Sequence, residues 1–114
     1  MRPAAADGRF EAARGETAMY AAIRQFKAKP GSADALAEKI KEAISIISDV
    51  SGFMGYYVVY APDDTVTAIS VFNTVAEAQE SNRRALAFIE ENLRPLVIGQ
   101  ASASAGPVIV HSLP

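Results

Sequence analysis

Few side chains in this sequence could do chemistry, and Arg24 has the most unusual surroundings among them. It lies in Met19–Lys27 (MYAAIRQFK), a stretch that is otherwise largely apolar. A guanidinium held there would be a fixed cation able to bind a carboxylate, phenolate or enolate. The other interpretation is an arginine at a seam between two copies of the chain, paired with an acidic residue of either copy. The residues alone leave both interpretations open.

Two tyrosines and an asparagine are further candidates for a binding site. Tyr56 and Tyr57 are neighbours on a predicted strand, so they point to opposite faces and only one is expected to meet a cavity. A tyrosine there would supply apolar contact and a hydrogen bond to an oxygenated ligand, with core packing as the alternative. Asn82 falls on the inward side of a predicted helix and could bind the backbone or a ligand. Its neighbours Arg83 and Arg84 are interpreted as solvated, paired with glutamates one turn away.

The remaining polar candidates give no recognisable catalytic pattern. His111 is the only histidine, and no spacing around it is typical of a metal site. We interpret it as a surface or interface residue, with proton transfer as the alternative. Ser102 and Ser104 lack the partners of a nucleophile, and Asp63 and Asp64 are predicted to form a turn. The sequence therefore predicts neither a metal nor a cofactor.

Composition excludes several classes of protein. The chain has 114 residues, 50% of them hydrophobic and 21% charged, which fits one globular domain. The formal net charge of −2 gives no basic patch for nucleic acid. There is no apolar run of roughly 18 residues, so no membrane span is predicted. The absence of cysteine excludes disulfides and thiolate chemistry and fits a cytoplasmic location.

The N-terminal segment differs in composition from the rest. Residues 1–18 mix alanine with arginine and acidic residues and lack the apolar core of a signal peptide. One interpretation is a disordered or frayed tail. The other is that translation naturally begins at Met19, because codons for Gly15-Glu16 can read as a bacterial ribosome-binding site. Either way, the domain is predicted to span residues 19–114.

Six elements follow from the apolar patterns and turn signals. A helical spacing of apolar residues predicts the two helices, and Thr74 with Glu77 forms a capping-box pattern at the start of the second. The final strand is expected to be centred on Val108–Val110. The predicted strands are 19–27, 51–60, 65–72 and 102–112, and the predicted helices are 33–50 and 73–93. The apolar side of the first helix is predicted to hold Leu36, Ile40, Ala43, Ile44 and Ile47.

The order strand, helix, strand, strand, helix, strand is typical of the α+β, ferredoxin-like βαββαβ fold. It places two helices on one face of a four-stranded antiparallel sheet and leaves the other face bare. The second strand is apolar or aromatic on both faces, with one set at Met54, Tyr56, Val58 and Tyr60 and the other at Phe53, Tyr57 and Val59. A bare apolar face usually marks an interface. We therefore expect a homodimer that joins the two open sheet faces.

Three stretches carry a family resemblance: KAKPGSADAL, SGFMGYYVV and AISVFNTVAEAQESNRRA. From Met19 onward the chain resembles the antibiotic biosynthesis monooxygenase (ABM) domain family of the dimeric α/β-barrel superfamily. The match implies that the face carrying Arg24 lines the barrel cavity. Within the second stretch, Gly52 is interpreted as ending the connection to the strand, and Gly55 as allowing close approach of the backbone.

The resemblance implies a small-molecule-binding protein without a cofactor. Members of the family include cofactor-free oxygenases that act on aromatic polyketides, haem-degrading enzymes and many barrels of unknown role. We therefore expect either a cofactor-independent monooxygenase for a phenolic or quinol-like aromatic substrate, or a non-catalytic ligand-binding or structural dimer. The predicted cavity residues are Tyr20, Arg24, Phe26, Tyr56, Phe72 and Asn82.

The haem-degrading branch is disfavoured by the residues at its functional positions. That branch uses an asparagine on the first strand, with a tryptophan and a histidine on the second helix. Alignment on the glycines and strand ends puts Arg24, Ser81 and Glu91 at those positions. None of the three matches, so haem degradation is not expected.

Overall fold

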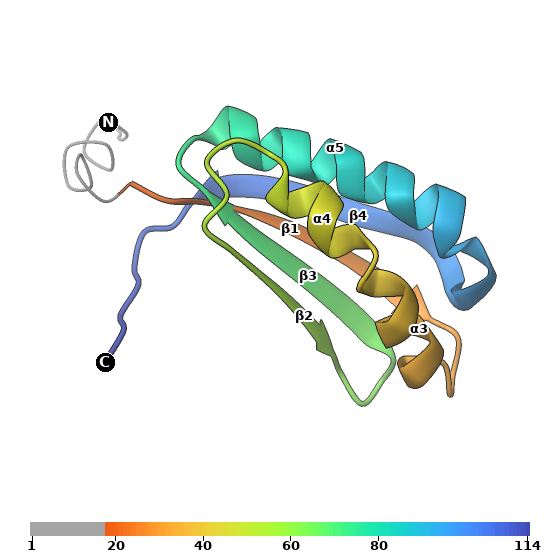
Figure 1. The fold of residues 1–114 in the computed structure, drawn as a ribbon. Helices are drawn as coiled ribbons and strands as arrows, with labels where there is room; N and C mark the ends of the chain where they lie inside the picture. The colour runs from red at the N-terminus through yellow and green to blue at the C-terminus, as the bar shows by residue number, and fades with distance from the viewer. Residues whose placement is uncertain (1–17) are drawn as a thin grey trace.

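The computed structural model describes residues 18–114, and the tail predicted over residues 1–18 falls almost wholly outside them. The elements follow the predicted order, with the first helix in two pieces (Figure 1). Their bounds are β1 Tyr20–Ala28, α3 Ala33–Ile40, α4 Ala43–Ser48, β2 Gly55–Tyr60, β3 Thr65–Phe72, α5 Val75–Asn92, the 3-10 turn η1 Arg94–Leu96 and β4 Val97–Pro107.

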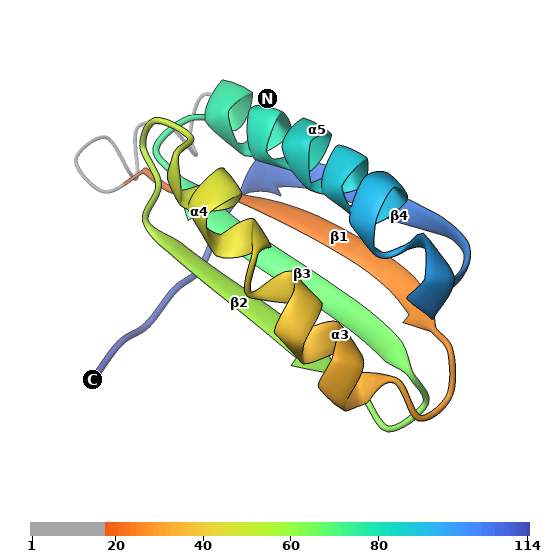
Figure 2. The ribbon, with the colours of Figure 1, turned by 45° about the vertical axis from the view of Figure 1, so that its right-hand side comes forward.

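The four strands form one antiparallel sheet in the order β2-β3-β1-β4. All helices lie on the same face, with α5 over β1 and β4 and with α3 and α4 over the β2 side (Figures 1 and 2). The predicted ferredoxin-like fold class is therefore confirmed. Because β1 is a central strand, its residues reach partners on both sides: Arg24 lies opposite Ala68 of β3 and Ala103 of β4.

Strand alternation sorts β1 and β3 into a helix-side set and an outer set. On β1, Ala22, Arg24 and Phe26 are buried beneath the helices, whereas Ile23 and Gln25 are exposed on the other face. The apolar core has two clusters, and on β1 Arg24 stands between Ala22 of one cluster and Phe26 of the other. Arg24 is the largest fully buried side chain in the described chain.

The first helix breaks after Ile40, which corrects the prediction of a single helix over 33–50. At the break, the amide of Glu42 donates to Lys39 and that of Ile44 to Lys41, at 3.0 and 3.2 Å. These are the tighter bonds to the third residue back that shorten a turn and change its phase. As a result Ile44, predicted to be buried, is 49% exposed.

The strand β2 begins four residues later than predicted, so alternation does not extend to Phe53 and Met54. Phe53 packs against Phe72 with 6.0 Å between ring centroids, on the helix side, and Met54 is half exposed. Gly52 has φ +79°, and a Cβ there would collide with the Glu77 carboxylate. At Gly55 a Cβ would meet only the Tyr57 ring, at 3.7 Å. Close approach is therefore required at Gly52 and not, as predicted, at Gly55.

The α5 helix begins with the capping box that the sequence predicts. The amide of Glu77 donates to the Thr74 hydroxyl, and the Thr74 amide donates to the Glu77 carboxylate, each at 3.1 Å. The backbone at Gly52 lies close to that same carboxylate. The cap and the glycine together fix how the loop before β2 crosses the start of α5.

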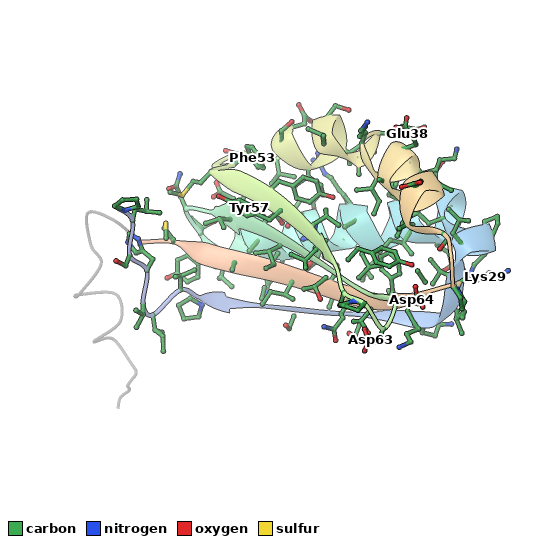
Figure 3. All side chains as sticks on the ribbon, turned by 90° about the horizontal axis from the view of Figure 1, so that it is seen from below. Lys29, Glu38, Phe53, Tyr57, Asp63 and Asp64 are labelled. Atoms are coloured by element: carbon green, nitrogen blue, oxygen red, sulfur yellow. The ribbon has the colours of Figure 1, made fainter. Side chains whose placement is uncertain are left out.

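The β2–β3 hairpin contains the predicted aspartate turn. Asp63 accepts a hydrogen bond from the Thr65 amide at 3.0 Å, and Asp64 adopts φ 69°. The Tyr60 hydroxyl also donates to Asp64, at 2.6 Å. Both aspartates lie at the end of the hairpin, away from Tyr57 on the strand, while Glu38 lies on the side of α3 turned away from the sheet (Figure 3).

The last strand spans Val97–Pro107, which corrects the prediction centred on Val108–Val110. Strand pairing with β1 ends at Tyr20 and Pro107, and only the bond from the Val108 amide to Met19 lies beyond it. The small and polar stretch that precedes Val108 has weak strand propensity and is held by its pairing with β1. Ile109 and Val110 are exposed, and the segment leaves the body of the domain (Figures 1 and 2).

The outer face of the sheet, here called the open face, is covered by no described residue. It is partly apolar: Tyr57 is 65% and Val59 55% exposed. It is also partly polar, with a hydrogen bond of 3.0 Å from Gln25 to Thr67. Its side chains include Ile23, Gln25, Tyr57, Val59, Thr67 and Ile69. Such a face is suited to a second copy of the chain, and the homodimer remains a prediction.

The outer side of α5 carries a network of ion pairs centred on Glu80. Arg83 binds this carboxylate through two nitrogens at 2.9 and 2.6 Å, and Arg84 binds it at 2.7 Å. Arg84 also reaches Asp49 after α4, at 3.4 Å. Hydrogen bonds from the two arginines lower the pKa of Glu80 from 4.5 to about 2. The predicted pairing of Arg83 and Arg84 with a nearby glutamate is confirmed.

A charge placed on the open face should dissociate the expected dimer. We expect Val59→Glu to sediment as a monomer at micromolar concentration and to melt at a lower temperature than the parent, because a buried interface of about 800 Å² per partner would receive an unpaired charge. Val75→Glu, on the exposed first turn of α5, is the matched control and should remain dimeric. A parent protein that is a stable monomer, or a Val59→Glu protein that stays dimeric, would show that this face is not the interface.

Acid should destabilise the parent more steeply than Glu80→Gln. Because the pKa of Glu80 is depressed in the folded state, its contribution to stability is complete above about pH 4.5 and is lost as the pH falls toward 2. Thermal melts of both proteins between pH 7 and pH 2.5 measure the difference. Glu91→Gln, at an exposed position of α5 outside these ion pairs, should follow the parent curve. Equal acid sensitivity of the parent and Glu80→Gln would show that these ion pairs contribute nothing.

Candidate functional site

Arg24 is a buried cation with only part of its hydrogen-bonding capacity used. Its side chain is 1% exposed. Nη1 donates to the Ser70 hydroxyl at 2.7 Å, to the Asn82 side-chain oxygen at 3.4 Å and to the Ala22 carbonyl at 3.4 Å. Nε and Nη2 are buried and make no hydrogen bond of 3.5 Å or less. The Tyr56 side chain still acts on the guanidinium as a weak hydrogen-bonding partner, which raises the pKa of Arg24 against the larger lowering caused by burial. Within residues 18–114, no carboxylate lies within salt-bridge distance of the guanidinium.

A chain of small polar side chains holds Nη1 in place. The Ser81 hydroxyl donates to the Ala78 carbonyl at 2.7 Å, so at 3.1 Å it must accept from Ser70. Ser70 then has its oxygen free to accept from Arg24. The Asn82 amide nitrogen donates to the Ser104 carbonyl at 2.8 Å, which directs its oxygen toward Arg24. Residues of β3, β4 and α5 therefore orient one arginine of β1.

Tyr56 is the tyrosine that meets this site. Its ring centroid lies 5.8 Å from the guanidinium carbon of Arg24, a distance at which the charge and the ring attract. Tyr57 lies on the open face. Burial raises the pKa of Tyr56, and the nearby positive charge only partly opposes that shift. Burial likewise lowers the pKa of Arg24, although an arginine remains charged in such surroundings. Tyr56 is therefore a neutral hydroxyl beside a cation.

Two hollows lie on the helix side of the sheet, and Arg24 lines only the inner one. The inner one is a void of about 20 Å³, room for roughly one water molecule. The outer one is a groove of about 350 Å³ between β2 and the helices α3 and α4. Ile40 and Tyr56 line both hollows, so the void and the groove adjoin at these two residues. The void is walled by Arg24, Phe26, Ile40, Ala43, Tyr56, Ala68, Ala85, Phe88, Ile89 and Leu93.

The structure brings four of the six predicted cavity residues together. Arg24, Phe26 and Tyr56 line the void, and Asn82 binds Arg24. Tyr20 and Phe72 belong to the other apolar cluster and line neither hollow.

His111 and the acidic side chains are separate candidates, for proton transfer and for metal binding. His111 is exposed beyond the end of β4, eight positions after Ala103, the β4 residue that pairs with Arg24. Its exposure agrees with the interpretation as a surface or interface residue, and the alternative role in proton transfer stays a prediction. Within residues 18–114, no three histidine, aspartate or glutamate side chains are grouped so as to hold a metal ion.

Sequence reasoning missed the residues that support Arg24. Ser70 interrupts the apolar helix side of β3, between Ala68 and Phe72, and a lone serine in such a row signals a buried polar partner. Ser81 falls one position before Asn82 on α5 and is fully buried. The pairing of Ser70 with Arg24 follows from the register, in which Ala22 lies opposite Ser70.

A family model decides the classification of the domain. The model described as antibiotic biosynthesis monooxygenase matches residues 19–87. The chain belongs to this family. The match covers β1 through most of α5, and it therefore includes Arg24, Tyr56, Ser70 and Asn82. The ABM resemblance noted in the sequence is confirmed.

Solved structures share the fold of this ABM-family protein. A protein of unknown function from Nitrosomonas europaea is 21% identical, with a TM-score of 0.69 over 85% of this chain and 95% of that one. Protein SO0527 from Shewanella oneidensis is 17% identical, with a TM-score of 0.63 over 82% and 94%. A MhuD variant with two manganese protoporphyrin IX molecules bound per active site is 15% identical, with a TM-score of 0.66 over 83% and 99%. At these identities the likeness shows the fold.

Two further findings complete the comparison. No curated protein matches the chain. Within residues 18–114, no helix is long and apolar enough to cross a membrane. Of the three positions matched to the haem-degrading branch, only Arg24 lines either hollow, while Ser81 is buried and Glu91 is exposed.

Arg24→Met should leave this ABM-family protein as stable as the parent or more stable. A buried ion carries a desolvation penalty of several kcal/mol, and no carboxylate within residues 18–114 pairs with Arg24 to offset it. Ser70 and Asn82 keep their bonds to Ser81 and Ser104. Thermal melts and sedimentation measure the outcome, with the exposed Arg83→Met as the control for loss of charge. The alternative of an arginine at a seam between two copies is disfavoured, because Arg24 is buried on the helix side, away from the open face. A lower melting temperature would instead show that its bonds to Ser70 and Asn82 stabilise the fold.

Proposed function

We propose that this ABM-family protein binds a small aromatic anion at Arg24, inside a dimeric α/β barrel. The observation that carries the proposal is the pair of buried nitrogens, Nε and Nη2, that have no partner. An uncompensated buried charge is costly, and a planar guanidinium edge matches the geometry of a carboxylate or a phenolate oxygen. The ligand would supply the negative charge that no described residue places beside Arg24.

The walls of the site favour an aromatic body. Phe26 and Phe88 lie beside the void, and Tyr56 stands between it and the groove. The void admits only a group of about the size of one water molecule. In the proposed complex the ligand oxygen therefore occupies the void against Arg24, and the ring lies in the groove next to Tyr56, whose hydroxyl can donate to a second oxygen.

The chemistry that this arrangement supports best is oxygenation without a cofactor. An ionised phenol or quinol can itself give an electron to dioxygen, and recombination on carbon forms a peroxide. Loss of water from the peroxide leaves a new carbonyl group, so that one oxygen atom enters the product and the other leaves in water. The protein contributes a dry pocket, a fixed cation for the oxyanion and orientation of the ring.

A ligand carrier is the second candidate function, and a specific observation favours it. No aspartate, glutamate or histidine lines either hollow, so the described residues offer no conventional general base. A carrier, or a structural dimer with an incidental pocket, needs none. The two candidates share the anion site and differ in whether bound substrate is consumed.

Oxygen uptake with a panel of anthrols and hydroquinones distinguishes them. An oxygenase should consume one O₂ per substrate and release a quinone, and Arg24→Met should lower the rate at least tenfold, because a charge-assisted bond to the oxyanion is lost. A carrier should bind the same compounds by calorimetry without oxygen uptake. Absence of both binding and uptake across the panel would reject both candidates.

Haem provides the negative control for the same preparation. Given haem and a reductant, the protein should release neither iron nor a biliverdin-like product, since its residues at the relevant positions are Arg24, Ser81 and Glu91. Efficient turnover of haem would contradict the matching of those positions. It would also contradict the proposed phenolic class of substrate.

A further inference from the structure

The groove that begins at Tyr56, the neighbour of Arg24, is much longer than a single aromatic ring requires. Its floor follows β2 over four residue steps, which is about 13 Å. Its other side follows α3 and α4 over a similar length. Tyr56 marks the end that adjoins Arg24, and Tyr60 marks the far end. Its principal lining residues are Leu36, Ile40 and Ile44 from the helices and Tyr56, Val58 and Tyr60 from the strand.

The break in the first helix creates part of this groove. A continuous helix would carry Ile44 toward the core, whereas the tight turn after Ile40 leaves it 49% exposed along the groove. Val58, on the helix side of β2, is likewise 37% exposed. These are large apolar side chains aligned in a row that no described residue covers.

Of the described residues that line the groove, only Lys41 is charged, and its charge is already paired within the chain. The ammonium group of Lys41 is held by Glu38 at 3.0 Å. Its carbon stem then serves as apolar wall. The negative charge of an occupant is therefore required at one end only, where Nε and Nη2 of Arg24 lack partners.

We infer that the ligand of this site is an amphipathic monoanion: an ionised aromatic head at Arg24 with an unbranched apolar tail lying along β2 toward Tyr60. The inference rests on the proposed binding at Arg24 and adds the tail to it. A tail attached to the ring opposite the ionised oxygen would extend from the ring directly into the groove. Charge at one end and aliphatic walls along the rest match this occupant better than they match a compact phenol.

A series of 4-alkylbenzoates tests the tail separately from the head. These compounds are ionised at neutral pH and differ only in tail length, from no tail to eight carbons. Titration calorimetry should show an affinity gain of up to about fourfold for each added methylene while the tail still gains contact with the groove. The gain should stop once the tail passes Tyr60.

Three variants assign the two halves of the ligand. Ala37→Phe places a ring within the groove, at an exposed helix position, and should remove the gain with tail length while benzoate itself still binds. Ala35→Phe adds the same ring on α3 outside the groove and should behave as the parent. Arg24→Met should weaken every member of the series by a common factor of about ten or more.

The outcomes separate failure of the tail from failure of the site. Binding that depends on Arg24 but not on tail length would overturn the tail and leave the anion site standing. Binding that is indifferent to Arg24→Met would overturn the proposed function itself. If Ala37→Phe dissociates the dimer in sedimentation while Ala35→Phe does not, a second copy of the chain covers the groove, and the tail assignment is wrong.

Discussion

The burial of one guanidinium in the middle of the core is the constraint on which the site depends. Moving a charge from water into an apolar interior is costly unless its hydrogen bonds are replaced. Here only Nη1 is satisfied, by Ser70, Asn82 and a carbonyl of its own strand. Those partners come from different elements, so β3 and α5 must hold their positions for Arg24 to be accommodated. The same polar group separates two apolar clusters that would otherwise meet.

The fold meets this constraint through strand register more than through local sequence. Because β1 is central, Arg24 is flanked on both sides, and its side chain runs back along the strand toward Ser70, which pairs with Ala22. The Ser70–Ser81 bond then joins the sheet to α5. Arg24 also lines the void, together with Tyr56, and its Nε and Nη2 lack a close hydrogen-bond partner. This partial support is the basis of the proposal that Arg24 binds an anion as well as joining the elements around it.

Much of this could be predicted from the sequence, for identifiable reasons. Alternation along β1 gave the face of Arg24, and helical spacing placed Asn82 inward. Alternation also showed that Tyr56 and Tyr57 diverge, but only the pairing of Tyr56 with Ser70 shows which of them meets the site. The predicted position of β4 was wrong because pairing with β1 outweighs the low strand propensity of the residues before Val108. The groove could not be predicted. It depends on a break in the helix that exposes Ile44, and the apolar pattern of the sequence continues through that break without interruption.

The absence of a lining general base does not by itself weigh against ionisation of a bound phenol. Tyr56 shows the balance at this depth: burial raises its pKa, and the charge of Arg24, 5.8 Å from the ring, opposes that only in part. In the proposed complex a ligand oxygen would contact Nε and Nη2 directly, where both the Coulomb attraction and the hydrogen bonds favour the ionised form. Its proton could leave through the groove to solvent. Arg24 would then set the ionisation state of the ligand while holding it, and one residue would perform both tasks.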